Sequence, residues 1–176
     1  MNLLSHGMPD VPHDRHYRND LHACGAPFPA FARFVAEATL GTVLDLGCGQ
    51  GRDALLFARA GHRVLGVDAS SVGLEQMSAV ARAEGLDLNA EVADLVSYRP
   101  PRTFDVVVLD RVLHMIHAQE RMTVLSTAMD AVAPGGHLLV AEGPKGLAPV
   151  REAIETRQWS LPRATKNRLI ARRPPA

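Results

Sequence analysis

The sequence lacks several features that would place it in large protein classes. It has only two cysteines, Cys24 and Cys48, so no disulfide framework is expected and a reducing, cytoplasmic location is the default. No apolar run approaches the roughly 18 residues of a membrane span, and no basic-then-apolar signal pattern opens the chain. Aromatic residues make up only 5% of the sequence. The 176 residues, 47% of them hydrophobic, are typical of one globular domain with a full core.

The formal net charge is zero, but the charge is unevenly distributed. Residues 151–176 contain seven Lys and Arg against two Glu, which is an excess of five positive charges, so the remainder carries an excess of five negative charges. A basic tail can contact nucleic acid, but a solvated terminal strand explains it equally well.

The segment from Val43 to Asp68, VLDLGCGQGRDALLFARAGHRVLGVD, predicts a strand, a glycine turn, a helix and a second strand. Gly47, Gly49 and Gly51 let the backbone turn sharply and approach a ligand without an intervening Cβ. Asp68, at the tip of the second strand, stands where the hydroxyls of a nucleotide ribose are bound. The segment therefore predicts a site for an adenosine-type cofactor.

The spacing of the glycines separates two kinds of cofactor. A dinucleotide site has the pattern G-x-G-x-x-G, but Arg52 stands where the third glycine of that pattern belongs. Asp45, two residues before Gly47, disfavours a pyrophosphate and suits a cofactor that carries a positive amino group. A nicotinamide-dependent Rossmann oxidoreductase is therefore the alternative, and a cofactor with an ammonium group is favoured.

The alternation of strands and helices continues along the chain. Strand patterns separated by helical ones predict a doubly wound α/β fold with a mostly parallel sheet and helices on both faces. The expected helices are 28–40, 72–84, about 119–132 ending before Pro134, and about 149–157; the expected strands are 88–93, 104–109, 137–141, 159–161 and 167–171, the last two joined by about five residues.

Four acids, Asp45, Asp68, Asp94 and Asp110, fall at or near the carboxyl ends of expected strands. Ligands in parallel sheets bind at this edge. Each acid also has an ordinary structural explanation, because Asp begins turns and caps helices. For Asp68, which follows the glycine unit, ribose binding is the favoured explanation.

The motif DLGCGQGR, followed by AGHRVLGVDAS, resembles the class I S-adenosylmethionine-dependent methyltransferases and is most similar to the tellurite-resistance group. The resemblance implies a seven-stranded Rossmann-like sheet whose last strand is antiparallel. It implies that Asp45 lies near the cofactor's amino group, Asp94 and Leu95 near the adenine, and Asp110 near the methionine end and the acceptor. The full cofactor-binding set expected is Asp45, Gly47, Cys48, Gly49, Gly51, Arg52, Asp68, Ala69, Ala93, Asp94, Leu95, Asp110 and Arg111.

Two of these residues have alternative roles. Arg52 is either a solvated residue of the first helical turn or a partner of the cofactor carboxylate, and the sequence favours neither. Cys48 is expected to contribute its backbone to the loop rather than to act as a nucleophile.

His114, in RVLHMIH, is the candidate general base if the acceptor must lose a proton, and His117 follows one turn later. A histidine after a strand is also explained as a hydrogen-bonded packing residue.

Residues 1–27 are expected to form a loop-like arm, and residues 28–176 a single domain. In similar methyltransferases the segment before the first helix folds over the cofactor, which nominates Tyr17 as a second candidate residue near the reaction. His13 and His16 have ligand spacing, and with His6, His22 and Cys24 they suggest a metal site. No paired second cluster supports it, so no metal is expected.

The expected function is methyl transfer to a small molecule by in-line displacement. The short stretch after Glu142 leaves little chain to enclose an acceptor, so the pocket is either open or covered by the arm or by a second subunit, as in a homodimer. This also puts tellurite in doubt as the acceptor. The alternatives are methylation of nucleic acid or protein, and a catalytically silent subunit that binds S-adenosylmethionine. Nucleic acid and membrane are not expected as partners.

Overall fold

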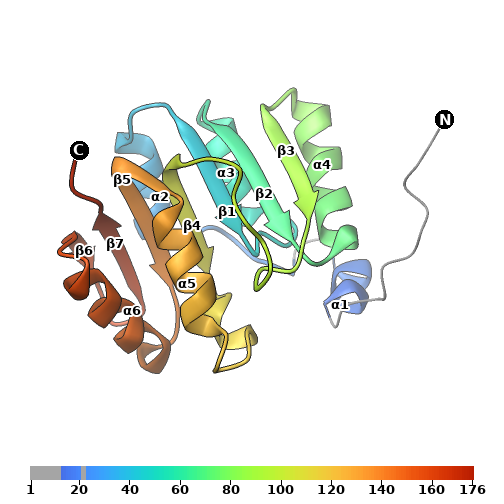
Figure 1. Ribbon diagram of the computed structural model, residues 1–176. Helices are drawn as coiled ribbons and strands as arrows, with labels where there is room; N and C mark the ends of the chain where they lie inside the picture. Colours follow the sequence, from blue (N-terminus) through green and yellow to red (C-terminus); the bar gives the residue numbers. More distant parts are fainter. Residues whose placement is uncertain (1–12, 21–22) are drawn as a thin grey trace.

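The computed structural model describes residues 13–20 and 23–176, and Figure 1 shows a twisted sheet flanked by helices. The sheet has seven strands in the order β3-β2-β1-β4-β5-β7-β6. The strands are β1 (Thr42–Leu46), β2 (Arg63–Asp68), β3 (Leu88–Val92), β4 (Phe104–Asp110), β5 (Val132–Ala141), β6 (Ser160–Ala164) and β7 (Arg168–Arg172). Strands β1 to β5 are parallel, whereas β7 is antiparallel to both of its neighbours. The predicted fold class, including the antiparallel last strand, is confirmed.

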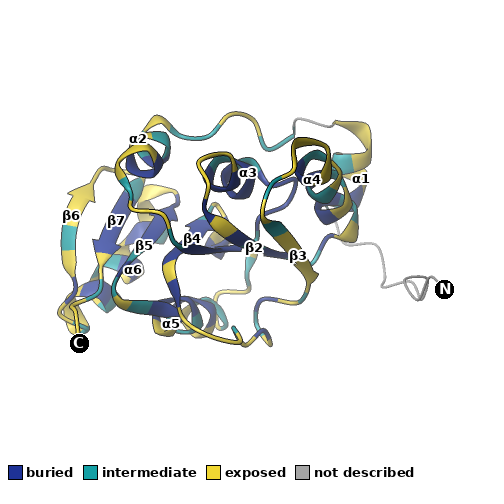
Figure 2. Cartoon of the chain, turned by 90° about the horizontal axis from the view of Figure 1, so that it is seen from above, coloured by how far each residue is buried: buried dark blue, intermediate teal, exposed yellow. Residues whose placement is uncertain are grey.

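Helices cover both faces of the sheet, as predicted. Seen from above in Figure 2, α2, α3 and α4 lie over one face, and α5 and α6 lie under the other. The helices are α1 (Asp14–Asn19), α2 (Pro29–Glu37), α3 (Arg52–Arg59), α4 (Ser71–Glu84), α5 (Arg121–Asp130) and α6 (Pro144–Thr156), and a short 3₁₀ turn, η1, spans Leu113–Met115. No helix within residues 13–20 and 23–176 is long and apolar enough to cross a membrane.

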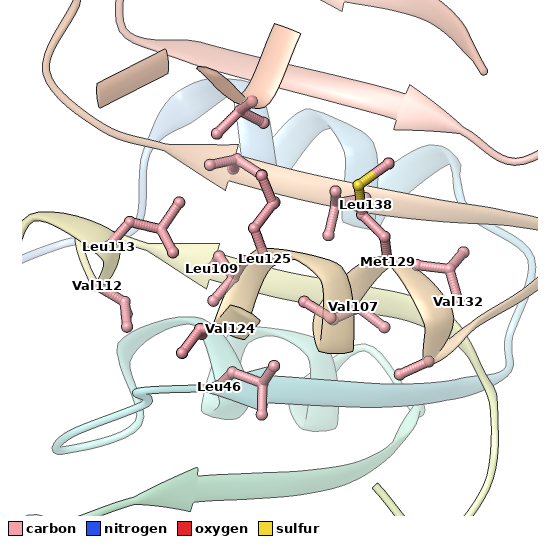
Figure 3. Close-up of a cluster of buried hydrophobic side chains, with 14 of the residues drawn as sticks. Leu46, Val107, Leu109, Val112, Leu113, Val124, Leu125, Met129, Val132 and Leu138 are labelled. Atoms are coloured by element: carbon pink, nitrogen blue, oxygen red, sulfur yellow. The ribbon is translucent and has the colours of Figure 1, made fainter. Parts of the chain in front are cut away.

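The central strands are buried on both faces because their side chains alternate between two hydrophobic clusters. In β4, Val107 and Leu109 pack toward α5, whereas Val106 and Val108 pack toward α2 and α3. Figure 3 shows the first of these clusters under α5. The loops that follow the central strands are thereby attached to a rigid support.

The boundary between α5 and β5 corrects the sequence-based expectation. The helix ends at Asp130 rather than Val132, and the strand begins at Val132 rather than His137. The Pro-Gly-Gly segment therefore lies inside the strand, where the pairing with β4 is irregular between Phe104 and Val106. Gly136 permits this because a Cβ there would meet the backbone oxygen of Asp105 at 2.7 Å. The helix-breaking Pro-Gly-Gly segment therefore marks an irregular stretch of strand rather than the end of the helix.

Other expectations also differ from the structure: the helix expected at 28–40 is α2, which spans Pro29–Glu37. The arm is not all loop, because α1 forms within it. Helix α6 begins at Pro144, whose missing N–H costs nothing in a first turn, and it continues through Pro149. The strand expected at 159–161 runs from Ser160 to Ala164, so the β6–β7 connection is three residues long rather than about five.

Candidate cofactor and acceptor site

A cleft of about 480 Å³ lies at the carboxyl ends of the central strands. From β1 the chain first continues to β2 and β3 on one side and then returns to β4 on the other side, so the strand order reverses between β1 and β4. Ligands bind at this point in sheets of this kind. Most of the predicted residues line the cleft: Tyr17, Asp45, Gly47, Cys48, Arg52, Asp68, Ala69, Asp94, Leu95, Asp110, Arg111 and His114. Gly49, Gly51 and Ala93 are not among its lining residues.

The glycine loop is attached to the neighbouring strand and needs its unusual backbone. The amide nitrogens of Gly47 and Cys48 donate to the carbonyl of Val67 at 2.7 and 3.2 Å. Gly51 has a φ of 82° and stands directly before α3, and a Cβ there would overlap the Met77 side chain. Gly51 therefore serves the turn and the packing of α3 against α4.

Asp68 holds the glycine loop from the end of β2. Its carboxylate accepts the Gly49 amide at 2.8 Å and the Ser70 amide at 2.7 Å. Burial raises its pKa, although these two hydrogen bonds oppose the shift. Each carboxylate oxygen has a further lone pair, so Asp68 can still accept from the hydroxyls of a ligand.

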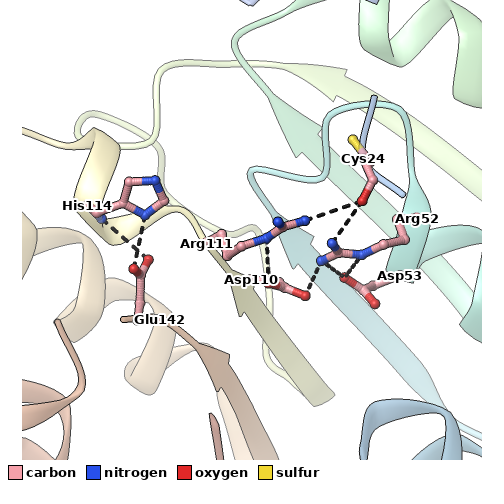
Figure 4. A network of polar contacts seen from close by, with 7 residues as sticks. All are labelled: Cys24, Arg52, Asp53, Asp110, Arg111, His114 and Glu142. Atoms are coloured by element: carbon pink, nitrogen blue, oxygen red, sulfur yellow. Dashed lines mark hydrogen bonds and ion pairs between the residues drawn. The ribbon is translucent and has the colours of Figure 1, made fainter. Parts of the chain in front are cut away.

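Figure 4 shows the Arg52 guanidinium between two carboxylates, those of Asp53 in α3 and Asp110 at the end of β4, and the buried Asp45 of β1 interacts electrostatically with all three groups. Arg52 pairs with Asp53 at 2.8 Å and closely with Asp110, and it donates to the carbonyl of Cys24 at 3.0 Å. Its side chain is only 6% exposed, so the solvated alternative for Arg52 is wrong. Sequence analysis missed Asp53; its place in the first turn of α3 was the available signal.

This cluster has more negative than positive charge. The pKa of Asp45 is raised well above its usual value by burial and by the charges of Asp53 and Asp110. Burial and Asp53 raise the pKa of Asp110 to about 7. Among the described residues of this cluster, Asp45 Oδ2, Asp53 Oδ1 and Asp110 Oδ1 are buried without a hydrogen-bond partner. Buried acceptor oxygens without a partner are costly, so these carboxylates fit a ligand with an ammonium or other cationic group.

The arm closes one side of the cleft. Gln50 donates to the carbonyl of Asp20 at 2.7 Å, and Gln76 donates to the carbonyl of Tyr17 at 3.0 Å. The Tyr17 ring lies so close to the loop that a Cβ on Gly49 would be 2.5 Å from its hydroxyl. Burial, with Cys24 and Asp68 nearby, raises the pKa of Tyr17, which keeps the phenol protonated.

Asp94 and Cys48 differ in their surroundings. Asp94 accepts from the Val96 and Ser97 amides at 3.2 Å and from the Ser97 hydroxyl at 2.9 Å, so the carboxylate also stabilises a turn at the cleft rim. Burial raises the pKa of the Cys48 thiol, which opposes nucleophilic reactivity.

His114 stands in η1, just after β4, and contacts an acid that sequence analysis did not select. Its Nδ1 is 3.0 Å from Glu142 Oε2, and its amide donates to Glu142 Oε1 at 3.3 Å. Glu142 follows β5 and is buried. Its place after the fifth strand, by the rule applied to the other acids, was the available signal.

The described chain has a second depression, outside the cleft. A depression of about 510 Å³, lined by residues including Phe34, Asp105 and His137, lies at the amino edge of the parallel strands, away from these acids. No group of three or more His, Cys, Asp or Glu in residues 13–20 and 23–176 could hold a metal ion. His6 and His22 lie outside the described residues.

The sheet order and the position of the glycine loop give the Rossmann-like fold that class I methyltransferases share. Residues 43–136, more than half of the chain, match the methyltransferase domain family. The chain therefore belongs to this family.

Known proteins agree with this assignment. A 2-heptyl-1-hydroxyquinolin-4(1H)-one methyltransferase from Mycobacteroides abscessus is 25% identical over 162 residues, covering 84% of this chain and 71% of the relative. The structure of TehB from Haemophilus influenzae has a TM-score of 0.76 at 16% identity, covering 92% of this chain and 65% of TehB. A TehB-like methyltransferase from Corynebacterium glutamicum has a TM-score of 0.72 at 24% identity, covering 93% of this chain and 98% of that one. The chain spans about half the length of several other curated relatives.

Proposed function

We propose that this chain transfers the methyl group of S-adenosylmethionine to a small-molecule acceptor by in-line displacement. The observation that carries the proposal is the group of buried carboxylates formed by Asp45, Asp53 and Asp110, with three oxygens that lack a hydrogen-bond partner in the described part of the chain, beside a glycine loop and Asp68. This arrangement suits a ligand with a cationic methionine end and a ribose. Family membership supports the same reaction.

Separate parts of the cleft would hold the two ends of the cofactor. Asp45 and Asp53 would accept its ammonium group, and Asp68 its ribose hydroxyls. Arg52 already donates to two carboxylates and a carbonyl, so we assign it to keeping the acids in place rather than to the cofactor carboxylate. When bound, S-adenosylmethionine supplies a methyl already activated by a positive sulfur, and the protein's task is to orient the reactants and exclude water.

The arm is the part of the chain best placed to exclude water. Tyr17, His13 and Cys24 line the cleft together with the residues of the strand ends. Asp14, at the start of α1, accepts from the Ser70 hydroxyl at 2.5 Å, which attaches α1 to the beginning of α4. We therefore assign the described part of the arm, residues 13–20 and 23–27, a lid role, and a covering second subunit is not needed for this proposal.

A small acceptor is favoured over nucleic acid. Several cations of the basic tail contact the protein itself: Arg157 pairs with Asp130, Arg163 pairs with Glu37, and Arg168 lies over the Phe28 ring at 3.6 Å. This leaves a weaker positive field than the composition suggests. Among the relatives, the Mycobacteroides enzyme is named for a small heteroaromatic acceptor.

Calorimetry tests the cofactor part of the proposal. S-adenosylmethionine and S-adenosylhomocysteine should bind, and NADH should not. Asp45→Asn should weaken the binding of both by roughly 30-fold or more, because truncating a buried charge pair costs about 2–5 kcal/mol. Asp87→Asn, the same change at an exposed acid, should leave affinity unchanged. Binding of NADH alone would overturn the proposal and favour an oxidoreductase.

A methylation assay with radioactive S-adenosylmethionine tests turnover. Thiols, phenols, amines and oxyanions should be offered as separate acceptors. Labelled product from at least one organic acceptor is expected. Cofactor binding with no product from the whole panel would contradict an enzymatic role and favour a silent cofactor-binding subunit.

A further inference from the structure

His114 and Glu142 follow two neighbouring strands and contact each other. His114 stands after β4, and Glu142 stands after β5, where its own amide donates to the carbonyl of Asn167 at 3.0 Å. The Glu142 side chain is 2% exposed, whereas that of His114 is 56% exposed. One partner is thus fixed inside the protein, and the other reaches the cleft and the solvent (Figure 4).

The geometry decides which imidazole nitrogen carries the proton. An ionised carboxylate only accepts hydrogen bonds, so beside an ionised Glu142 a neutral His114 ring carries its proton on Nδ1, which is 3.0 Å from Oε2. The second oxygen of Glu142 accepts the amide of the same histidine, which fixes the carboxylate against the turn. The lone pair is therefore left on Nε2, as a general base requires.

The surroundings of His114 indicate what kind of acceptor it would meet. Val112, Met115 and Ile116 line the same cleft, and Met115 is 50% exposed, so the entrance next to the histidine is apolar. The cleft is lined by five carboxylates and two guanidinium groups, an excess of negative charge that repels an inorganic oxyanion. An uncharged, largely apolar molecule fits these walls better.

We propose that Glu142 is a positioning residue that holds His114 as the general base for an apolar acceptor with a weakly acidic hydroxyl, such as a hydroxyarene. This rests on the proposed methyltransferase function. Nε2 of His114 takes the hydroxyl proton as the acceptor oxygen forms its bond to the methyl carbon. The electron pair of the breaking carbon–sulfur bond stays with sulfur, which becomes neutral. Because His114 is exposed, it then releases the proton to water.

NMR of the ¹⁵N-histidine-labelled protein tests the positioning without any turnover. At pH 8 and without cofactor, the His114 ring should be protonated at Nδ1. Glu142→Gln should shift this ring toward the Nε2-protonated tautomer, while Glu152→Gln, the same change at an exposed site on α6, should not. An Nε2-protonated His114 in the unaltered protein would overturn the proposal.

Kinetics with 1-naphthol and with sodium tellurite test the acceptor class. His114→Asn should lower kcat for 1-naphthol by roughly 10²–10⁴-fold, the usual worth of a general base, and Glu142→Gln by at least tenfold. His117→Asn, at an exposed histidine that does not line the cleft, should change kcat less than twofold. S-adenosylhomocysteine affinity should be unchanged in all variants.

The pH profile separates a base from a structural residue. The charged groups around His114 are Glu142, Arg121 of α5, which donates to its carbonyl at 3.2 Å, and Arg111, which also lines the cleft. In the unaltered protein kcat should fall on the acid side of the profile, and this limb should vanish in His114→Asn. If the unaltered protein does not bind S-adenosylhomocysteine, the methyltransferase function itself is refuted. Intact binding with methylation of tellurite, or without methylation of 1-naphthol, would refute only the inference drawn here about the acceptor.

Discussion

Acidification should weaken cofactor binding through the carboxylates around Arg52. The pKa of Asp110 is raised to about 7, because the group is buried and close to Asp53. A cationic ligand favours the ionised carboxylate, so binding below this pKa must first expel a proton. Affinity should therefore be lost as the pH falls through 7, and should change little between 7.5 and 8.

The magnitude follows from the pKa. At pH 6, one unit below the raised pKa of Asp110, protonated carboxyl outnumbers carboxylate by about ten to one. The Kd for S-adenosylhomocysteine should then be about tenfold higher than at pH 8, a loss of roughly 1.4 kcal/mol. Asp45 belongs to the same cluster, and its raised pKa acts in the same direction, so tenfold is the lower bound.

Calorimetry in buffers of different ionisation enthalpy measures both the Kd and the protons released. About one proton should be released per ligand at pH 6, and fewer at pH 8. Asp110→Asn should bind more weakly and lose most of this pH dependence. A Kd that is the same at pH 8 and pH 6, or an unchanged pH dependence in Asp110→Asn, would refute the reasoning.

Three further predictions concern stability and the lid. The native protein holds the proton of Asp45 more tightly than the unfolded chain does, so the free energy of unfolding falls as pH rises above the ordinary carboxyl range. In urea unfolding, Asp45→Asn should therefore gain stability relative to the unaltered protein between pH 5 and pH 8. An equal difference between the two proteins at both pH values would count against this. Arg52→Met leaves its two carboxylate partners buried without their cation and should cost about 3–5 kcal/mol in the same assay, so a loss below about 1 kcal/mol would contradict the buried pairing. Deleting residues 1–20 removes Tyr17 from the cleft and should weaken S-adenosylhomocysteine binding and turnover, whereas unchanged values would disprove the lid.

Local patterns in the sequence were sufficient for the architecture. Alternating apolar strands and amphipathic helices predict a doubly wound sheet because each element must bury one face or stripe, and β1 and β4 are buried as expected. Boundaries were less certain where a local signal has two meanings. Pro134 and the glycines after it break helices, yet here they lie within β5, because Val132 and His137 on either side of them pair with Phe104 and Val106 of β4.

The sequence alone determined the fold class and the family, and it placed acids at the strand ends, since chain order and strand direction bring those ends to one edge. Only the tertiary structure decided what each acid contacts. Arg52 is buried between Asp53 and Asp110, and Glu142 meets His114 from 28 positions away. Burial, unpartnered oxygens and raised pKa values arise from groups distant in the chain being desolvated together, which no local pattern records.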